Sequence, residues 1–283
     1  MIEDLTTRVD GSTAEARQPA DPRRMTATIK TLARRLGADD VGIAQLNPQF
    51  VYAHVGRGPE PWGAPIELHH RLAVVFTVEM DFAAVAQAPR LPIAREAAHQ
   101  YLKAAQISVA LASHIRTLGY PARAHIAGSN YQIMLPPVAH DAGLGELGRM
   151  GYLSSPRLGG RIRLGGVTTD LPLVPGRPIA FGVQDFCERC RKCAINCPSG
   201  AIPSGPRSTV RGVEKWPLDI EQCLRYWRLV GTDCGLCMRV CPFSHPGTLV
   251  HRLVRAGVRH SPIARRISIA GDDLLYGRRV QIR

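Results

Sequence analysis

The stretch Phe186-Cys-Glu-Arg-Cys-Arg-Lys-Cys-Ala-Ile-Asn-Cys-Pro198 decides how the chain is organised. Its spacing is C-x2-C-x2-C-x3-C-P, and its cysteines are Cys187, Cys190, Cys193 and Cys197. A second run, C-x10-C-x2-C-x3-C-P, consists of Cys223, Cys234, Cys237 and Cys241. These two runs hold all eight cysteines of the 283-residue chain. The cysteines therefore define a compact module that follows a cysteine-free body of about 180 residues.

This spacing is typical of bacterial ferredoxins, in which three thiolates two residues apart surround one cuboidal cluster and the fourth, followed by proline, ligates the other cluster. By this rule, one [4Fe-4S] cluster takes Cys187, Cys190, Cys193 and Cys241. The second cluster takes Cys197, Cys223, Cys234 and Cys237. A pair of zinc sites is the alternative, but three cysteines at uniform x2 spacing suit a tetrahedral ion poorly. We therefore predict two [4Fe-4S] clusters.

Composition and charge indicate a folded protein without a membrane span. Hydrophobic residues make up 45% and charged residues 21%, close to the globular average. The longest apolar run, residues 72–78, is too short to cross a bilayer. The first 24 residues show neither a secretory nor a twin-arginine signal, so we expect a cytoplasmic protein, in which cysteines favour metal ligation over disulfides. The net charge of +13 is dispersed, and we do not expect nucleic acid as a partner.

Periodicity in the cysteine-free body predicts a mixture of helices and strands. Helical patterns cover residues 25–36, 93–118 and 137–142. Strand patterns cover residues 41–44, 72–78, 121–130 and 167–173, and residues 47–68 read as an irregular loop rich in glycine and proline. Because these helices and strands do not alternate regularly, an α+β fold is favoured over a doubly wound sheet.

Several further segments, in their order along the chain, resemble the reductive dehalogenase family and the related epoxyqueuosine reductases. They are Leu36-Gly-Ala-Asp-Asp-Val-Gly-Ile-Ala44, Ile115-Arg-Thr-Leu-Gly-Tyr120, Ala142-Gly-Leu-Gly-Glu-Leu-Gly-Arg149 and Thr168-Thr-Asp-Leu-Pro-Leu173, followed by the two cysteine runs. The resemblance covers about residues 25–280 and implies a nitroreductase-like cobalamin-binding domain followed by a two-[4Fe-4S] ferredoxin-like domain. It also implies a base-off corrinoid, which agrees with the absence of an Asp-x-His-x-x-Gly motif from the sequence.

The resemblance gives each part of the chain an expected role. Residues 1–24 are expected to be a disordered N-terminal segment, and residues 25–178 the cobalamin-binding and catalytic domain. The two-[4Fe-4S] ferredoxin domain is expected to comprise residues 179–250. Residues 251–283 form a basic segment, which we expect to pack on the body.

The family's mechanism implies a tyrosine that supplies a proton and a neighbouring cation that stabilises the tyrosinate. Order and spacing match the tyrosine to Tyr101 and the cation to Arg161 or Arg163, which the sequence does not separate. Asn130 occupies the region where a polar residue reaches the cobalt face. Tyr131 is the rival acid, and a simple helix contact is the alternative role for Tyr101.

Corrinoid contacts are expected in the run of residues 142–149. The glycines Gly143, Gly145 and Gly148 suit a close approach of the backbone to a bulky cofactor. Glu146 and Arg149 either bind the amide side chains of the corrinoid or pair with each other. The ten histidines show no ligand spacing, apart from the adjacent pair at 69–70, and we treat them as structural or surface residues.

The function implied is that of a cobalamin-dependent iron-sulfur oxidoreductase, a reductive dehalogenase of an organohalide. A ferredoxin or flavodoxin is the expected electron donor. An epoxyqueuosine reductase-like enzyme of tRNA modification is a second hypothesis, but residues 128–131 read Gly-Ser-Asn-Tyr where that family carries its catalytic aspartate. A third hypothesis is a non-catalytic ferredoxin-like electron carrier or a corrinoid-handling protein.

Overall fold

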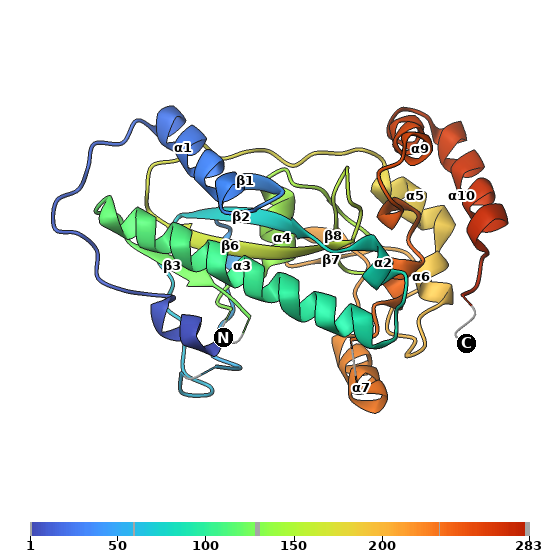
Figure 1. Cartoon of the computed structure of the whole chain (residues 1–283), viewed down its shortest axis with the longest axis horizontal. Coiled ribbons are helices and arrows are strands. Elements are labelled where there is room, and N and C mark those ends of the chain that lie inside the picture. The colour runs from blue at the N-terminus through green and yellow to red at the C-terminus, as the bar shows by residue number, and fades with distance from the viewer. Residues whose placement is uncertain (1, 59, 128–130, 232, 281–283) are drawn as a thin grey trace. The chain divides into compact units, whose positions relative to one another are not determined.

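The structure is a computed structural model that describes residues 2–58, 60–127, 131–231 and 233–280 (Figure 1). The chain divides into two compact units that interleave along the sequence. Unit 1 comprises Met1–Glu79, Ala98–Leu144 and Arg163–Pro178. Unit 2 comprises Met80–Ala97, Gly145–Ile162 and Ile179–Arg283. Two segments that we assigned to the body, Met80–Ala97 and Gly145–Ile162, thus group with the cysteine module, because their side chains pack on it.

A four-stranded sheet is the centre of unit 1. Its strands are β1 (Asp40–Gln45), β2 (Leu72–Glu79), β3 (Ala122–His125) and β6 (Ile162–Thr169), in the order β1-β2-β6-β3. The pairs β1–β2 and β3–β6 are antiparallel, with Val41 opposite Phe76 and Ile43 opposite Val74. The six central residues of β2 are all buried, which means that both faces of the sheet are covered.

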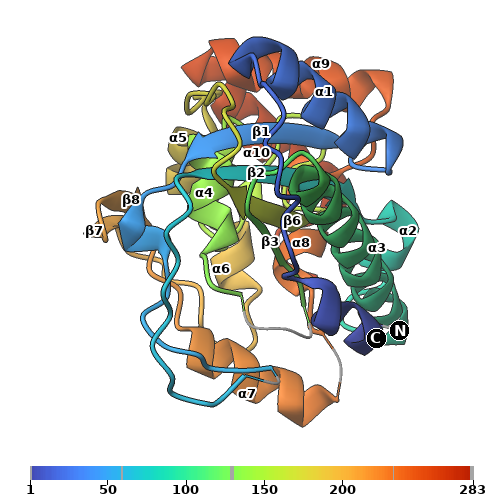
Figure 2. The ribbon, with the colours of Figure 1, turned by 90° about the vertical axis from the view of Figure 1, so that its left-hand side faces the viewer.

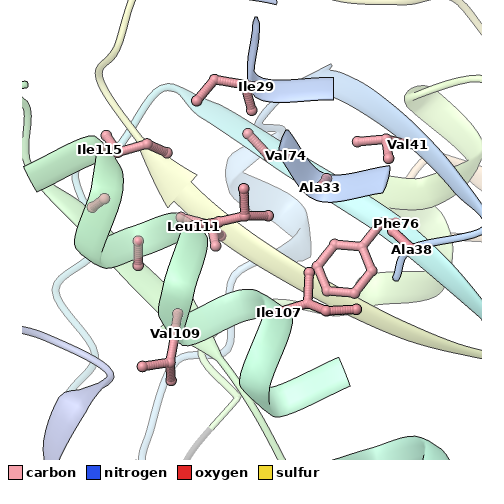
Figure 3. Close-up of a cluster of buried hydrophobic side chains, with 14 of the residues drawn as sticks. Ile29, Ala33, Ala38, Val41, Val74, Phe76, Ile107, Val109, Leu111 and Ile115 are labelled. Carbon is pink, nitrogen blue, oxygen red and sulfur yellow. The ribbon is translucent and has the colours of Figure 1, made fainter. Parts of the chain in front are cut away.

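Two helices cover one face of this sheet, α1 (Pro22–Arg35) and α3 (Leu91–Thr117). Figure 3 shows side chains of α1 and α3, including Ile29 and Leu111, directed toward Val74 and Phe76 of β2. The apolar positions of each helix recur every three to four residues, so burying them against the flat sheet removes one continuous stripe from water. This packing explains why the two helices were recognisable in the sequence.

A third helix, α4 (Leu135–Asp141), lies across the opposite face, as Figure 2 shows for β1 and β2. The helix approaches so closely that larger side chains do not fit beneath it. A Cβ at Gly166 would lie 2.8 Å from Leu135 Cδ2, and one at Gly42 would lie 2.8 Å from Ala142 Cβ. We expected a strand at residues 167–173, whereas β6 begins at Ile162. Gly165 and Gly166 interrupt the apolar pattern and so concealed the first half of the strand.

The N-terminal segment differs from the disordered tail expected for residues 1–24. The structure places a short 3-10 helix, η1 (Glu3–Arg8), at its start and buries Val9 in the core of unit 1. The Arg116 side chain donates to the Val9 carbonyl at 3.4 Å, and the Tyr120 hydroxyl donates to the Gln18 carbonyl at 2.8 Å. These long-range hydrogen bonds satisfy backbone carbonyls of the N-terminal segment. The segment is polar and has no periodic pattern, so its order was not predictable from the local sequence.

Unit 2 combines short helices with two small hairpins. Its elements are α2 (Phe82–Val85), β4 (Glu146–Leu147), β5 (Leu153–Ser154), α5 (Val183–Cys190), α6 (Lys192–Ile195), β7 (Ser208–Val210), β8 (Val213–Lys215), α7 (Ile220–Val230), α8 (Leu236–Arg239), η3 (Pro242–Ser244), α9 (Leu249–His260) and α10 (Pro262–Tyr276); η2 (Pro48–Phe50) belongs to unit 1. The mixture of helices and small antiparallel sheets confirms the expected α+β class.

The basic segment expected to pack on the body forms α9 and α10, and the following contacts join these helices to other parts of unit 2. Arg265 of α10 pairs with Asp185 of α5 at 2.9 Å, and Asp272 forms a buried ion pair with Lys192. Val258 of α9 enters a small core with Phe186 and other residues of the cysteine module. Throughout the described part of the chain, no helix has the length and apolarity needed to cross a bilayer.

Candidate functional site

Short helices and tight turns present the eight cysteines in unit 2. Helix α5 ends at Cys190, and Arg191 adopts a left-handed conformation, with φ of 52°, before α6 carries Cys193. In the second run, Cys223 lies on α7, and Gly235, with φ of 64°, begins the turn of α8 that carries Cys237. Such turns bring thiols that are two or three residues apart to one point, which a continuous helix would not do.

Electrostatic neighbours divide the thiols into two groups of four. In the first group, burial raises the pKa of Cys187 and of Cys193, and the next contribution comes from nearby thiols that include Cys241. Burial, and then the neighbouring Cys190, raises the pKa of Cys241 to about 12. In the second group, the pKa values of Cys223 and Cys237 are raised by burial and then by thiols that include Cys197 and Cys234. Buried thiolates that repel one another need cations at their centre.

This donor set fits two iron-sulfur clusters. Each group supplies four thiols from both cysteine runs, since Cys241 joins the first run and Cys197 the second, and a cubane cluster uses four cysteine ligands. Among the residues that the structure describes, no three His, Cys, Asp or Glu side chains are arranged to hold a single metal ion. A zinc site holds four ligands around one ion, whereas a cubane spreads its thiolates over four irons.

Glu146 and Arg149, for which the sequence predicts either corrinoid contacts or a mutual pair, hold the backbone around the cysteine module. The Glu146 carboxylate accepts hydrogen bonds from the backbone N–H groups of Phe181 and Val183, at 2.6 and 3.0 Å. The fully buried Arg149 donates to the Cys187 carbonyl at 3.0 Å and stacks on Trp216, with 4.6 Å from its Cζ to the ring centroid. Neither alternative that the sequence left open describes these contacts, because the partners are main-chain groups distant in sequence.

Two of the three glycines of the same run are required by the fold itself. Gly143 has a φ of 79°, which side-chain-bearing residues rarely adopt. A Cβ at Gly145 would lie 2.2 Å from the Ser154 carbonyl oxygen across the β4–β5 hairpin. At Gly148 a Cβ would lie 3.9 Å from Cys187 Sγ, an ordinary contact. The close approach that we expected toward a cofactor is, at Gly145, an approach to the chain's own backbone.

In unit 1, Tyr101 and Arg163 form a direct pair. Tyr101 lies on α3 and Arg163 on β6, and the Arg163 Cζ stands 5.0 Å from the centroid of the Tyr101 ring. Arg163 is buried, at 9% exposure, so its charge is poorly screened by water. The structure therefore distinguishes two arginines that the sequence could not separate.

Arg161 serves a different purpose within unit 2. Its Nε donates to the Ser244 carbonyl at 3.1 Å, and its Nη1 donates to the Met80 carbonyl. The guanidinium also stands 5.9 Å from the Phe82 ring centroid. The side chain is 2% exposed and holds three backbone segments of unit 2 together. These contacts tie Arg161 to the backbone of unit 2.

Tyr131, the rival acid, belongs to the same cluster as Tyr101. Burial, and next the neighbouring Tyr101, raise the pKa of Tyr131 far above its ordinary value, while Arg57 and Arg163 act in the opposite direction. Tyr52 is a further electrostatic neighbour. We refer to Tyr52, Arg57, Tyr101, Tyr131 and Arg163 as the tyrosine cluster. Asn130, which we also proposed for this site, lies outside the described residues.

Sequence reasoning missed Arg57 and Tyr52, because both lie in the irregular loop that carries no motif. The loop is tied to the Tyr131 segment by a hydrogen bond from the Tyr52 N–H to the Gln132 carbonyl at 2.9 Å. An isolated bridge between Val51 and Ile133 continues this pairing. This antiparallel contact, formed between segments some 80 residues apart, brings the loop to the tyrosines.

A buried histidine, His125, is hydrogen-bonded to the segment that carries Tyr131. The Gln132 N–H donates to His125 Nδ1 at 3.4 Å, and His125 Nε2 lies 3.0 Å from Thr168 Oγ1, which also contacts His70 Nδ1 at 2.9 Å. Burial, followed by the charge of Arg123, lowers the pKa of His125 to about 3, so this imidazole is neutral at pH 7. A neutral ring with Nδ1 as acceptor donates from Nε2. His125 is thus structural, in line with our sequence-based treatment of the histidines.

Comparison with protein families identifies the module. Residues 186–245 match the family model described as a 4Fe-4S dicluster domain. This range contains all eight cysteines and confirms the predicted ferredoxin-like domain.

Curated relatives cover most of this chain. The tetrachloroethene reductive dehalogenase of Sulfurospirillum multivorans is 33% identical over 292 aligned positions, which cover 91% of this chain and 58% of that protein. The corresponding enzyme of Desulfitobacterium hafniense is 30% identical and covers 82% of this chain and 50% of its own length. The epoxyqueuosine reductase of Escherichia coli is more distant, at 24% identity over 80% of this chain. The chain spans about half the length of the dehalogenases that it matches.

Solved structures agree with this relationship. The catabolic reductive dehalogenase NpRdhA, solved in complex with 3-bromo-4-hydroxybenzoic acid, superposes with a TM-score of 0.88 at 33% identity, covering 98% of this chain and 40% of that one. An epoxyqueuosine reductase from Bacillus subtilis reaches a TM-score of 0.53 at 17% identity, which shows a shared fold alone. The resemblance seen in the sequence is confirmed: this chain is a reductive dehalogenase homologue that carries a 4Fe-4S dicluster domain, and the epoxyqueuosine reductases are its distant relatives.

Proposed function

We propose that this protein catalyses the reductive dehalogenation of an organohalide, using two [4Fe-4S] clusters and a base-off corrinoid. In this reaction a carbon–halogen bond accepts two electrons and one proton, and the products are the carbon–hydrogen compound and a halide ion. The Tyr101–Arg163 pair in unit 1 is the observation that carries the proposal. It supplies a proton donor with an adjacent cation in a homologue of dehalogenases.

The two thiol groups support an electron relay. Four buried thiols in each group can hold one [4Fe-4S] cluster, and each cluster carries one electron at a time. Cys237 of the second group is among the charges that act on Cys193 of the first, so the two groups are neighbours within unit 2. Electrons that enter one cluster can therefore pass to the other without leaving the module.

The open loop of unit 1 fits a large organic cofactor. Trp62 is 81% exposed and Tyr52 is 42% exposed, so both aromatic side chains are in part accessible to solvent. At Gly56 and Gly63, no heavy atom lies within 4 Å of where a Cβ would stand. A bound base-off corrinoid supplies a strongly reducing cobalt for the carbon–halogen bond. We assign its contacts to this loop, since Glu146 and Arg149 are engaged elsewhere.

Tyr101 is the proposed proton donor. When its hydroxyl releases a proton to the substrate carbon, the buried guanidinium of Arg163 stabilises the resulting tyrosinate. Tyr131 is a poorer acid at this position, because burial raises its pKa and keeps the phenol protonated. Its role in the proposal is that of a neutral hydrogen-bonding neighbour.

The two other hypotheses have weaker support. For tRNA modification, the sequence at 128–131 lacks the aspartate of the epoxyqueuosine reductases. For a simple electron carrier, the tyrosine cluster would have no purpose. Organohalide substrates are named for the relatives: tetrachloroethene for the Sulfurospirillum enzyme and 3-bromo-4-hydroxybenzoic acid in the NpRdhA complex.

The test begins with cofactor content. Protein purified without oxygen and reconstituted with iron, sulfide and hydroxocobalamin should contain about eight iron atoms and one corrinoid per chain. With titanium(III) citrate as the reductant, it should release bromide from 3-bromo-4-hydroxybenzoate or chloride from tetrachloroethene. Full iron content without corrinoid uptake would favour the carrier hypothesis. A fully loaded protein that releases no halide but reduces epoxyqueuosine in tRNA would replace dehalogenation by the second hypothesis.

A further inference from the structure

We propose that the outer face of α9 and α10 is the docking surface for a small acidic electron-carrier protein that reduces the first thiol group's cluster. The inference rests on the proposed function for the presence of that cluster. We define the α9–α10 face by its exposed apolar and basic residues: Leu249, Val250, Arg252, Leu253, Val254, Arg259, Ile263, Arg266, Ile267, Leu274 and Leu275.

The apolar part of this face is extensive. Leu253 is 63% exposed, Ile267 is 66% exposed and Leu274 is 84% exposed. Large apolar side chains on two adjacent helices form a continuous patch, and such patches mark interaction sites more often than single exposed leucines do. Figure 1 shows α9 and α10 side by side within unit 2.

Both helices repeat the same order of residues along their outer stripe. In α9, Leu249 is followed by Arg252 and Leu253, and in α10, Ile263 is followed by Arg266 and Ile267. Positions i, i+3 and i+4 share one face of a helix, so each stripe sets an arginine beside two apolar side chains. An apolar centre with interspersed arginines is the composition of a protein interface.

The charge of the face identifies the kind of partner. Residues 251–280 contain seven arginines and two acids, Asp272 and Asp273. Both carboxylates are already paired, Asp272 with Lys192 and Asp273 with Arg278. Arg252, Arg259 and Arg266 are exposed, and no acidic partner is found for them among the described residues. A positively charged surface with apolar side chains favours an acidic partner protein, and the opposite charges increase the association rate.

The first thiol group lies directly beneath this face. Val258 of α9 is buried in a core with Phe186 and Cys190, and Ile269 of α10 packs against the same core together with Cys187 and Cys241. One layer of side chains therefore separates the docking face from the thiols. Electrons can cross such a layer without a covalent path to the surface.

An apolar pocket opens between the two helices and reaches toward the cysteines. Its volume is about 450 Å³. Val254, Ile267 and Leu275 line it together with Phe186 and Phe243. Phe186 directly precedes Cys187, and Phe243 is two residues after Cys241. A pocket of this kind receives an anchoring side chain of a partner.

Buried polar contacts hold α10 firmly against the cysteine loop. His245 Nε2 lies 2.6 Å from Asp272 Oδ1, and Lys192, which adjoins Cys193, binds the other carboxylate oxygen. The Tyr276 ring stacks on His245 with centroids 4.0 Å apart. The face is therefore preorganised, which reduces the entropic cost of docking.

The electron balance of the step is simple. The reduced carrier gives up one electron, and the oxidised cluster, [4Fe-4S]2+, becomes [4Fe-4S]1+. No proton is transferred and no covalent bond changes. The carrier must be low-potential, and plant-type [2Fe-2S] ferredoxins meet that requirement.

The test measures cluster reduction by a reduced, acidic plant-type [2Fe-2S] ferredoxin in stopped flow. The paired variants Arg252→Glu and Arg266→Glu should lower the second-order rate at least about tenfold at low salt, because they reverse the charge that guides the encounter. Leu253→Ser and Ile267→Ser should weaken binding with little change in salt dependence. Reduction by titanium(III) citrate should be unaffected in all four variants, since that reductant needs no docking face.

The exposed helix α7 provides matched controls. Leu229 is 83% exposed, and Arg228 lies beside it, so Leu229→Ser and Arg228→Glu make the same changes on another helix of unit 2. Their rates with ferredoxin should equal that of the wild type. Equal losses in the α7 variants, or unchanged rates in the α9–α10 variants, would overturn the proposal.

Other occupants of the face have distinct outcomes. If Leu253→Ser dissociates a dimer detected by sedimentation, a second copy of the chain covers the face and the proposal fails. If Arg252→Glu abolishes sedimentation with phosphatidylglycerol vesicles while ferredoxin rates stay unchanged, the face is a membrane surface instead. The assay needs no substrate, so a chain that accepts electrons but releases no halide would sink the proposed function and leave this inference standing.

Discussion

The cysteine module of unit 2 and the tyrosine cluster of unit 1 bring their functional residues together in different ways. Seven of the eight cysteines lie in two short stretches, residues 187–197 and 234–241, and tight turns suffice to gather them. The tyrosine cluster draws on four separate segments: the loop at 52–57, α3, residue 131 and β6. Cluster ligation is therefore visible in spacing, whereas an acid and its cation become neighbours only when the sheet forms.

Arg161 and Arg163 show the same difference within three residues. Arg163 faces Tyr101 in unit 1, and Arg161 binds the carbonyls of Ser244 and Met80 in unit 2. The same residue type thus contacts a tyrosine ring at one position and backbone carbonyls at the other. The following four experiments test that contrast, from the largest expected effect to the smallest.

Replacing a thiol that joins the two cysteine runs should have the largest effect. Cys241→Ser should lose the first group's cluster, so the iron content should fall from about eight to about four atoms per chain. EPR of the reduced protein should then show the same residual signal for Cys241→Ser as for Cys187→Ser. Cys237→Ser should leave the other signal. If Cys241→Ser and Cys237→Ser leave identical spectra, our division of the ligands is incorrect.

Removing the proposed acid should impair turnover and nothing else. Tyr101→Phe keeps the ring and loses only the phenol proton, so halide release should fall about 10²- to 10⁴-fold with iron and corrinoid content intact. Tyr131→Phe is the matched control from the same cluster and should have a smaller effect. Unchanged turnover in Tyr101→Phe together with lost turnover in Tyr131→Phe would transfer the acid role to Tyr131. Loss of corrinoid from Tyr101→Phe would instead indicate a packing role.

The two arginines should separate stability from activity. Arg161→Leu leaves two buried carbonyl groups without their guanidinium donor, so the free energy of unfolding should fall by about 2–3 kcal/mol. Arg163→Leu should mainly lower turnover, and Arg163→Lys should restore part of it, since the charge returns. Urea unfolding and halide release, measured on the same preparations, give both quantities. Similar unfolding midpoints for Arg161→Leu and Arg163→Leu would contradict the different roles that we propose for the two arginines.

The smallest expected effect is on the pH dependence of stability, and it concerns His125, which contacts Gln132 next to Tyr131. Its pKa is about 3 in the folded protein and about 6.5 when exposed, so the unfolded state binds the extra proton below pH 6.5. This contribution to stability is complete at pH 7 and declines as the pH falls from 6.5 toward 3. Between pH 7 and 5.5, the wild type should lose about 1 kcal/mol more than His125→Gln. Parallel pH profiles for the two proteins would show that His125 is not buried in its neutral form.

The sequence by itself determined the dicluster module, the α+β class and the family resemblance. Thiol spacing records cluster chemistry directly, because the turns that gather Cys187, Cys190 and Cys193 are local. Helical periodicity likewise revealed α1 and α3, whose apolar stripes cover one face of the sheet. Each of these features depends on residues close together in the chain.

Tertiary structure alone decided the roles of individual polar residues. Pairing of β3 with β6 and docking of α3 placed Arg163 at Tyr101, and the Val51–Ile133 bridge carried Tyr52 and Arg57 to Tyr131. The N-terminal segment gained its order from Arg116 and Tyr120, more than 100 residues away. Such contacts depend on burial and on partners distant in sequence. The contribution of a buried arginine or glutamate to stability therefore depends on hydrogen-bond partners that the local sequence does not reveal.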